Sequence, residues 1–167
     1  MAKKARQKKP QKRSDRVLVV RVKDLQIGLE NLSKWLPNPA ALKEIHVILP
    51  DISFLFSLLK FDDQNAAVNT ILEAWSIGVT TKLSVHFNLL KMLSPESLVD
   101  LPSLWTDQNG KAVIIHSCTL IDYADVALLD NCFVMAPTRV LVTDLAAEHM
   151  NKRNVQLIKR KQGYVSG

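Results

Sequence analysis

The sequence of 167 residues lacks the signatures of several large enzyme classes. Only five glycines occur, and neither GxGxxG nor GxxxxGK[ST] is present, which excludes the common phosphate-binding loops. No Gly-x-Ser-x-Gly elbow offers a hydrolase serine. No apolar run reaches the roughly 18 residues that a membrane-spanning helix needs. With 47% hydrophobic residues and a mean hydropathy of +0.04, the composition is that of an ordinary globular protein of one domain.

Metal-binding and redox patterns are missing as well. Cys118 and Cys132 lie in apolar surroundings without CxxC or Cys/His spacing, so we expect both to be buried, reduced thiols of an intracellular protein. The four histidines are dispersed along the chain: His46, His86, His116 and His149. We therefore expect neither a structural metal nor a cofactor.

The net charge of +6 is concentrated in the first 16 residues. This segment has eight basic residues against one acidic residue, a net charge of +7, so the remaining chain carries −1. Its basic residues are Lys3, Lys4, Arg6, Lys8, Lys9, Lys12, Arg13 and Arg16. We predict that 1–16 is a disordered arm that contacts RNA or an acidic partner; a nuclear or nucleolar import signal and a solubilising end are the alternatives. The expected location is intracellular, in the nucleus or nucleolus or in the cytoplasm.

The rest of the chain alternates strand-like and helix-like segments. Apolar runs typical of buried strands occupy 17–22, 45–49, 83–87, 140–142 and 155–158. Apolar residues at helical spacing lie between them, and 123–135 also favours a helix. We predict a three-layer α/β domain with a mostly parallel central sheet over 17–160, followed by a tail over 161–167. No internal repeat is visible.

The segment 139–158 predicts one parallel βαβ unit. A continuous apolar strand, Val140 to Val142, is followed by an amphipathic helix and by the strand Val155 to Ile158. This order places Asp144 at the carboxyl edge of a strand, where open α/β sheets hold their ligands. Asp144 is also well placed to cap the helix, and the two interpretations stay open.

The order of elements resembles the PIN domain, a small α/β nuclease fold of RNA processing, and in particular fungal PIN proteins associated with nonsense-mediated decay. The resemblance spans 16–158 and is carried by Gly28–Asn31 with Trp35, by Val47–Pro50 and by Val140–Asp144. It implies acidic site residues at Asp144 and at Asp125, with Asp122 as the alternative to Asp125.

Two acids of that family are replaced in this chain. The resemblance places Arg21 where the first strand should end in aspartate, and Phe56 at or near the second acid. A guanidinium and a phenyl ring cannot ligate a divalent cation. We therefore expect a vestigial site, unless Asp24 substitutes and acts with Asp125 and Asp144 on Mg²⁺ or Mn²⁺.

Three functions follow from these observations. The first is a non-catalytic, PIN-like adaptor of RNA processing or mRNA surveillance, whose basic arm contacts RNA or an acidic protein. The second is a metal-dependent endoribonuclease that uses Asp24, Asp125 and Asp144. The third is a structural subunit that packages RNA within a ribonucleoprotein. The sequence favours the first.

Overall fold

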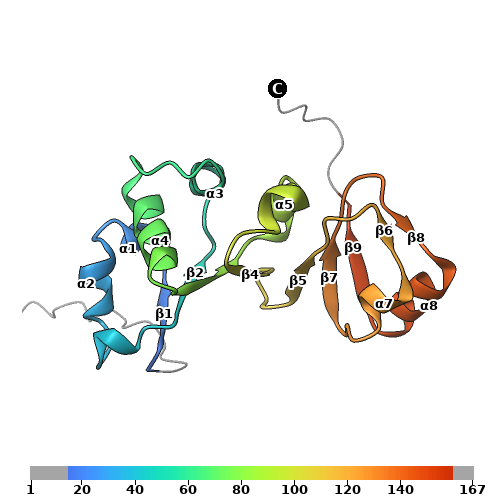
Figure 1. The fold of residues 1–167 in the computed structure, drawn as a ribbon, viewed down its shortest axis with the longest axis horizontal. Helices are drawn as coiled ribbons and strands as arrows, with labels where there is room; N and C mark the ends of the chain where they lie inside the picture. The colour runs from blue at the N-terminus through green and yellow to red at the C-terminus, as the bar shows by residue number, and fades with distance from the viewer. Residues whose placement is uncertain (1–14, 160–167) are drawn as a thin grey trace, which may run out of the picture.

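The computed structural model describes residues 15–159 as one long sheet flanked by helices, with a small second sheet (Figure 1). The main sheet contains β1 (Val17–Val20), β2 (Glu44–Ile48), β3 (Thr80–Ser84), β4 (Ser103–Thr106), β5 (Ala112–Ile115), β7 (Cys132–Met135) and β9 (Val155–Ile158). The second sheet pairs β6 (Leu120–Ile121) with β8 (Leu141–Val142).

The helices of the N-terminal half connect its strands. They are α1 (Val22–Leu25), α2 (Leu29–Ser33), the 3-10 helix η1 (Pro39–Ala41), α3 (Ile52–Leu59), α4 (Ala66–Ser76), α5 (Phe87–Leu90) and α6 (Pro95–Leu98). The C-terminal half has α7 (Tyr123–Val126) and α8 (Asp144–Lys152). Within 15–159, no helix is both long enough and apolar enough to cross a bilayer.

The strands follow one another across the main sheet without a reversal of order. Their order is β1-β2-β3-β4-β5-β7-β9, and all neighbours are parallel except β4 and β5. Because crossovers between parallel strands are right-handed, crossovers that always advance in one direction lie on one face. The helices between β1 and β4 are therefore confined to a single face of the sheet.

That covered face carries the larger hydrophobic core. Val20, Val47, Leu83, Trp105 and Val113 form one row across β1 to β5 by their register. Each is nearly fully buried, and each belongs to the cluster that includes the inward side chains of α1 to α6. Burial of these side chains in one continuous core holds the N-terminal helices to the sheet.

The antiparallel pairing of β4 with β5 moves the next helices to the opposite face. Strand direction reverses at this hairpin while the order continues to advance, so right-handed crossovers now pass over the other side. Val134 and Leu157 accordingly pack with Val126, Ala146 and Met150 of α7 and α8 in a second core. Figure 1 shows these two helices beside β7 and β9, at the opposite end of the molecule from α1 and α2. The predicted three-layer α/β architecture with a mostly parallel sheet is confirmed.

Asp107 organises the hairpin that causes this change of face. Its side chain is 5% exposed, and Oδ1 accepts hydrogen bonds from the backbone N–H groups of Asn109 at 2.9 Å and Lys111 at 2.8 Å. Gly110 closes the turn with a φ of 84°, a left-handed conformation that favours glycine. One carboxylate thus fixes the point at which the helical layer changes sides.

The C-terminal half repeats one backbone unit twice. β5, β6 and α7 form the first coil, β7, β8 and α8 the second, and each strand pairs in parallel with its counterpart in the next coil. Asn131 and Asn154 end the two coils with φ values of 46° and 53°, and Asn154 Nδ2 donates to Asn131 Oδ1 at 2.8 Å. The repeat escaped the sequence analysis because it lies in backbone geometry and not in residue identity.

Several local predictions were wrong in this half of the chain. The helix expected over 123–135 ends at Val126 and gives way to β7. The unit expected over 139–158 is divided, because β8 belongs to the small sheet and β9 to the main sheet. Cys118 is exposed; only Cys132 is buried, and burial raises the pKa of its thiol.

Replacing Asp107 with alanine is expected to lower the free energy of unfolding by about 2 kcal/mol. The change removes the charged acceptor of two partly buried hydrogen bonds from backbone N–H groups of the turn. Urea denaturation of the variant, beside Asp100→Ala at an exposed acid, measures the effect. Equal stability of the two variants would show that the carboxylate does not hold the turn.

The asparagine pair predicts a graded response at position 154. Asn154→Ala loses the side-chain hydrogen bond and places a Cβ-bearing residue without local side-chain bonding in the left-handed region, costing about 2 kcal/mol in total. Asn154→Gly loses only the hydrogen bond and should cost about half as much. Thermal unfolding can rank both against Asn151→Ala, an exposed asparagine of α8. The ranking fails if glycine proves as damaging as alanine.

Candidate protein-interaction surface

The reverse face of β1 to β5 is the most unusual surface of the molecule. Val19, His46, Lys82 and Leu104 form a row across β1 to β4 on the side opposite the larger core. The hairpin register continues this row to Ile114 on β5, and Ile114 pairs with Val134 on β7. We call this surface the open face. It comprises Val17, Val19, Glu44, His46, Ile48, Thr80, Lys82, Ser84, Leu104, Thr106, Ala112 and Ile114.

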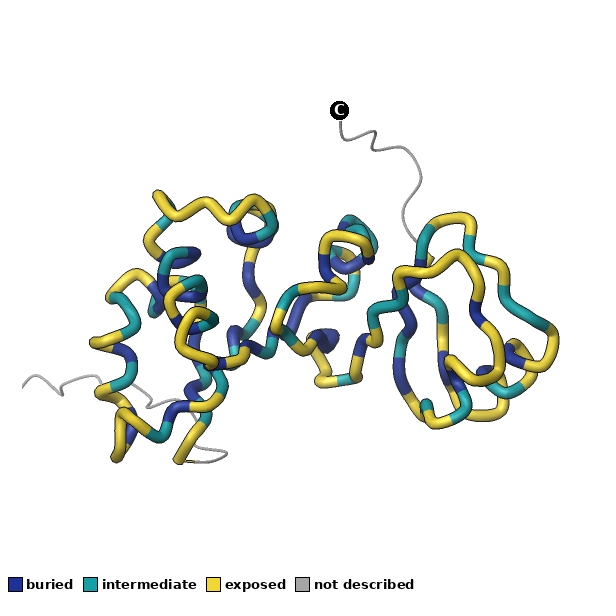
Figure 2. The backbone as a smooth tube through the Cα atoms, in the orientation of Figure 1, coloured by how far each residue is buried: buried dark blue, intermediate teal, exposed yellow. Residues whose placement is uncertain are grey.

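Exposure increases along that row from β7 to β4, and the residues beyond Leu104, which are Lys82, His46 and Val19, are half-buried. Val134 is 2% exposed beneath α7 and α8, Ile114 is 38% exposed, and Leu104 is 62% exposed. Figure 2 shows buried residues alternating with less buried ones along β1 and β2, as expected for strands with only one covered face. Among residues 15–159, the second helical layer therefore stops at the β7 end of the sheet.

Uncovered parallel sheet is rare in proteins. Parallel strands occur almost only with both faces covered, because the helices of their crossovers normally pack on both sides. Antiparallel sheets, in contrast, often leave one polar face in water. An uncovered parallel face with exposed aliphatic side chains indicates a surface that another chain covers.

Polar side chains are tied together at the centre of the open face. His46 Nε2 lies 2.6 Å from Ser84 Oγ, Ser84 Oγ lies 2.8 Å from Thr106 Oγ1, and Thr106 Oγ1 donates to the carbonyl of Asp107. This chain of contacts spans β2, β3 and β4. It satisfies the hydroxyl groups within the sheet, and so leaves the aliphatic side chains and Lys82 as the groups available to a partner.

Lys82 supplies the charge in the middle of the surface. It is half-buried between His46 and Leu104 in the register, and its ammonium forms no hydrogen bond or salt bridge within residues 15–159. The open face therefore combines exposed aliphatic residues with one central cation, a composition suited to a protein partner with apolar and acidic groups.

The predicted acidic residues cap helices or lie in the first turn of a helix, and they are in separate parts of the molecule. Asp24 Oδ2 accepts from the N–H of Arg21 at 2.9 Å, at the start of α1. Asp122 and Asp125 accept from each other's N–H groups in a capping box of α7. Asp144 is exposed in the first turn of α8, where Thr143 is the N-cap.

No acidic cluster results from this placement. Within the described residues there is no group of three histidine, cysteine, aspartate or glutamate side chains that could hold a metal ion. Figure 1 shows α1, which carries Asp24, far from α7 and α8, which carry Asp125 and Asp144. Arg21 and Phe56 are both exposed, at the N-cap of α1 and on α3.

Most of the basic arm lies outside the residues that the structure describes. Lys3, Lys4, Arg6, Lys8, Lys9, Lys12 and Arg13 fall outside the described residues. Arg16 is exposed, and its carbonyl accepts from the backbone N–H groups of Lys43 and Glu44, which anchors the start of β1 to β2.

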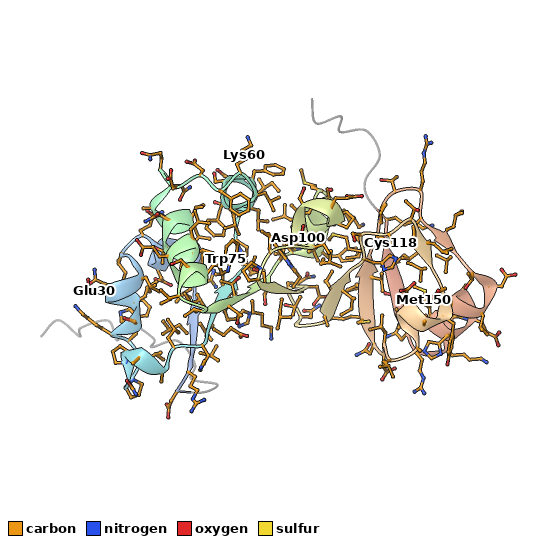
Figure 3. All side chains as sticks on the ribbon, viewed as in Figure 1. Glu30, Lys60, Trp75, Asp100, Cys118 and Met150 are labelled. Atoms are coloured by element: carbon orange, nitrogen blue, oxygen red, sulfur yellow. The ribbon has the colours of Figure 1, made fainter. Side chains whose placement is uncertain are left out.

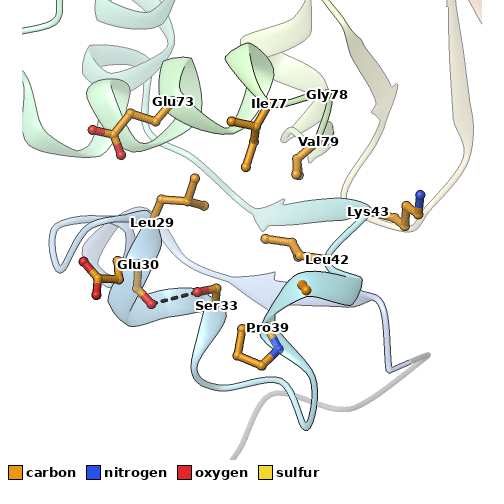
Figure 4. A pocket seen from close by; sticks show the side chains of 11 residues that line it. Leu29, Glu30, Ser33, Pro39, Leu42, Lys43, Glu73, Ile77, Gly78 and Val79 are labelled. Atoms are coloured by element: carbon orange, nitrogen blue, oxygen red, sulfur yellow. Dashed lines mark hydrogen bonds between the residues drawn. The ribbon is translucent and has the colours of Figure 1, made fainter.

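A pocket lies in the N-terminal half, away from the open face (Figure 4). It has a volume of about 480 Å³ between α2, η1 and the end of α4, and Leu29, Leu42 and Val79 line it. Ser33 Oγ at its rim donates to the carbonyl of Glu30 at 2.7 Å, which is a bond within α2. Its half-open shape and mixed lining give no set of convergent polar groups that would orient a small ligand.

The C-terminal half has a second exposed aliphatic pair. Leu120 and Leu141 face each other in the register of the small sheet, and Leu145 lies one turn beyond, in α8. Figure 3 shows side chains around the C-terminal strands, with Met150 within this half and Cys118 at its edge toward α5. The pair is smaller than the open face and lies over a sheet of two strands.

The sequence analysis missed the open face, although the sequence contains a signal for it. Strands buried on both faces are continuous apolar runs, whereas Glu44 and His46 alternate with apolar residues in Glu44–Ile48, and Thr80–Ser84 contains four polar residues. His46 and Lys82 occupy the polar positions. We predicted buried strands at 45–49 and 83–87 and overlooked this alternation.

Comparison with known proteins places the chain in a family different from the one expected. A family model described as "Putative propanediol utilisation" matches residues 7–156. A "Bacterial microcompartment assembly protein PduM" of Salmonella typhimurium is 32% identical over 117 residues, which are 70% of this chain and 72% of that protein. The protein of the same name from Citrobacter freundii is 34% identical over 117 residues, with the same coverage of both chains. No solved structure matches the chain.

These findings overturn the predicted resemblance to PIN domains. They also contradict the three predicted roles: the RNA-processing or mRNA-surveillance adaptor, the endoribonuclease and the RNA-packaging subunit. RNA and RNA-processing complexes were wrongly predicted as partners. The intracellular location agrees with the bacterial relatives, whereas the nuclear and nucleolar addresses have no support. The matches with PIN proteins were short strand ends and caps, which many α/β proteins share.

Stability measurements can test whether the open face is uncovered in the isolated protein. Leu104→Thr places a β-branched side chain, which strands favour, at this exposed position and should change the free energy of unfolding by less than about 0.5 kcal/mol. Trp105→Ala, one residue along and 3% exposed on the opposite face, should cost about 3–5 kcal/mol. Comparable losses at both positions in urea denaturation would mean that part of this chain covers Leu104.

Proposed function

We propose that this chain, which belongs to the putative propanediol utilisation family, helps to assemble bacterial microcompartments by binding a protein partner through its open face. The role in assembly is supported by the two relatives, which are named for it. The binding mode is supported by the uncovered parallel sheet, and Leu104 at 62% exposure is the observation that carries it.

The proposed role needs no catalytic group, metal or cofactor of this chain. The four acids singled out from the sequence cap helices or lie in first turns, where they stabilise the helix dipoles. Assembly instead requires a rigid surface presented without reorganisation. The larger core supports such a surface, because it holds the backbone of β1 to β5 from the opposite face, while the smaller core holds β7 and β9 beside it.

The location follows from the same proposal. A protein that assembles microcompartments acts in the cytoplasm of a bacterium, at the particle or at its precursors. The basic arm, which has no assigned role here, is not needed for the binding mode. The division of the chain into 1–16, 17–160 and 161–167 stays a prediction.

Leu104→Glu is expected to abolish or strongly reduce microcompartment formation. The added carboxylate stands beside Lys82 in the register, so the variant should fold, while the aliphatic contact with the partner is lost. The variant would replace the native gene in a bacterium that forms microcompartments, and thin-section electron microscopy would count the particles per cell.

Two matched variants interpret the result. Leu128→Glu introduces the same charge at a side chain that is 98% exposed and away from the open face, and it should leave particle numbers unchanged. Leu141→Glu tests the aliphatic pair of the small sheet. Normal assembly with Leu104→Glu, or loss with Leu141→Glu alone, would contradict binding through the open face.

A further inference from the structure

We infer that the occupant of the open face is a single amphipathic helix of a partner protein, with aliphatic residues on Leu104 and Ile114 and an acidic residue opposite Lys82. This inference rests on the proposed function, because it names the kind of partner that the same surface receives. It follows from the dimensions of the face, its charge and its position beside α7 and α8.

The dimensions argue against a second copy of this chain. Five strands at about 4.8 Å spacing, each about 15 Å long, give a face of roughly 360 Å². A stable dimer of folded bodies buries about 800 Å² per partner. The area that two open faces could bury by packing together is thus about half of what a stable dimer needs.

The sequence at the two ends of the chain does not favour either end as the occupant. Residues 1–14 contain eleven polar, basic or proline positions and no leucine, isoleucine, valine or aromatic residue, so they have no apolar stripe to place on Leu104. Residues 160–167 follow β9, which is separated from β4 by β5 and β7 in the sheet. Gly163 and Gly167 lower the helix propensity of that segment.

A helix of a partner protein fits the part of this sheet face that α7 and α8 leave uncovered. A helix is about 10 Å wide and covers about two strands, and 10 to 12 residues span the 15–18 Å length of these strands. The existing layer of α7 and α8 covers β7 and β9 on this same face and ends where Ile114 becomes exposed. A partner helix over β4 and β5 would continue that layer and extend the kind of covering that parallel strands normally receive.

The charge pattern sets the chemistry of the helix. Its apolar stripe, at positions i, i+3, i+4 and i+7, would lie on Leu104 and Ile114. An aspartate or glutamate on the flank of that stripe would pair with Lys82, which is half-buried in the register next to Leu104. The hydroxyl groups of Ser84 and Thr106 are already bonded to each other and need nothing from the partner.

Site-specific photo-crosslinking in the full chain would test the inference. Benzoylphenylalanine replaces Leu104 in one strain and Leu128 in a control strain, both in bacteria that form microcompartments. Position 104 should crosslink at least tenfold more than position 128. The linked residues should fall within one partner segment whose apolar residues recur at i, i+3, i+4 and i+7.

A synthetic peptide of the mapped segment then tests its conformation and charge. It should gain helical circular dichroism on titration with the full chain, and Lys82→Glu should weaken its binding about tenfold. Changing the flanking acid of the peptide to lysine should restore binding to the Lys82→Glu chain. A peptide that binds without becoming helical, or crosslinks between two copies of this chain, would overturn the inference.

The outcomes separate the two proposals. If Leu104→Glu stops assembly but the mapped segment is extended, the open face is the assembly surface and the helical partner is wrong. If position 104 crosslinks no more than position 128 and Leu104→Glu assembles normally, both proposals fail.

Discussion

The handedness of strand crossovers is the constraint on which this structure depends. Seven strands advance in one direction across the sheet, so each set of right-handed connections must stay on the face that the strand direction selects. In doubly wound folds the order reverses near the middle, and helices reach both faces. Here only the β4–β5 hairpin changes the strand direction, and with it the covered face. The result is two helical layers that lie on opposite faces and at opposite ends of one sheet.

This arrangement explains why the molecule has two cores and where its exposed aliphatic residues lie. The larger core fills the side of α1 to α6, and the smaller one fills the side of α7 and α8. Each core ends where its helices end. The open face is the area that neither layer reaches on the N-terminal side, so its exposure follows from the topology of residues 15–159. Asp107, which holds the hairpin, also determines where that face stops.

The sequence was sufficient for the class of the fold but not for its topology. Apolar runs such as Val17–Val20 and the stripe of Ile52–Leu59 identify strands and helices, because side-chain periodicity is a local property. Strand order and crossover face depend on contacts between distant segments, which periodicity does not encode. For this reason the single antiparallel pair and the split of β8 from β9 were not predicted. The candidate acids failed for a related reason: Asp24, Asp122 and Asp125 have the spacing of capping residues, and capping is what they do.

The polar centre of the open face has a physical role in such a surface. A parallel sheet with a wholly aliphatic bare face would bind other apolar surfaces without discrimination. His46, Ser84 and Thr106 interrupt the aliphatic residues and satisfy one another within the sheet, so water can cover the face when no partner is bound. Lys82 adds a charge whose burial is unfavourable unless an acid meets it. A partner without an acidic residue opposite Lys82 would bind weakly, because it would bury an unpaired cation. The attraction itself would come from Leu104 and Ile114. An assembly protein needs this combination, because it must stay dispersed until it meets its partner.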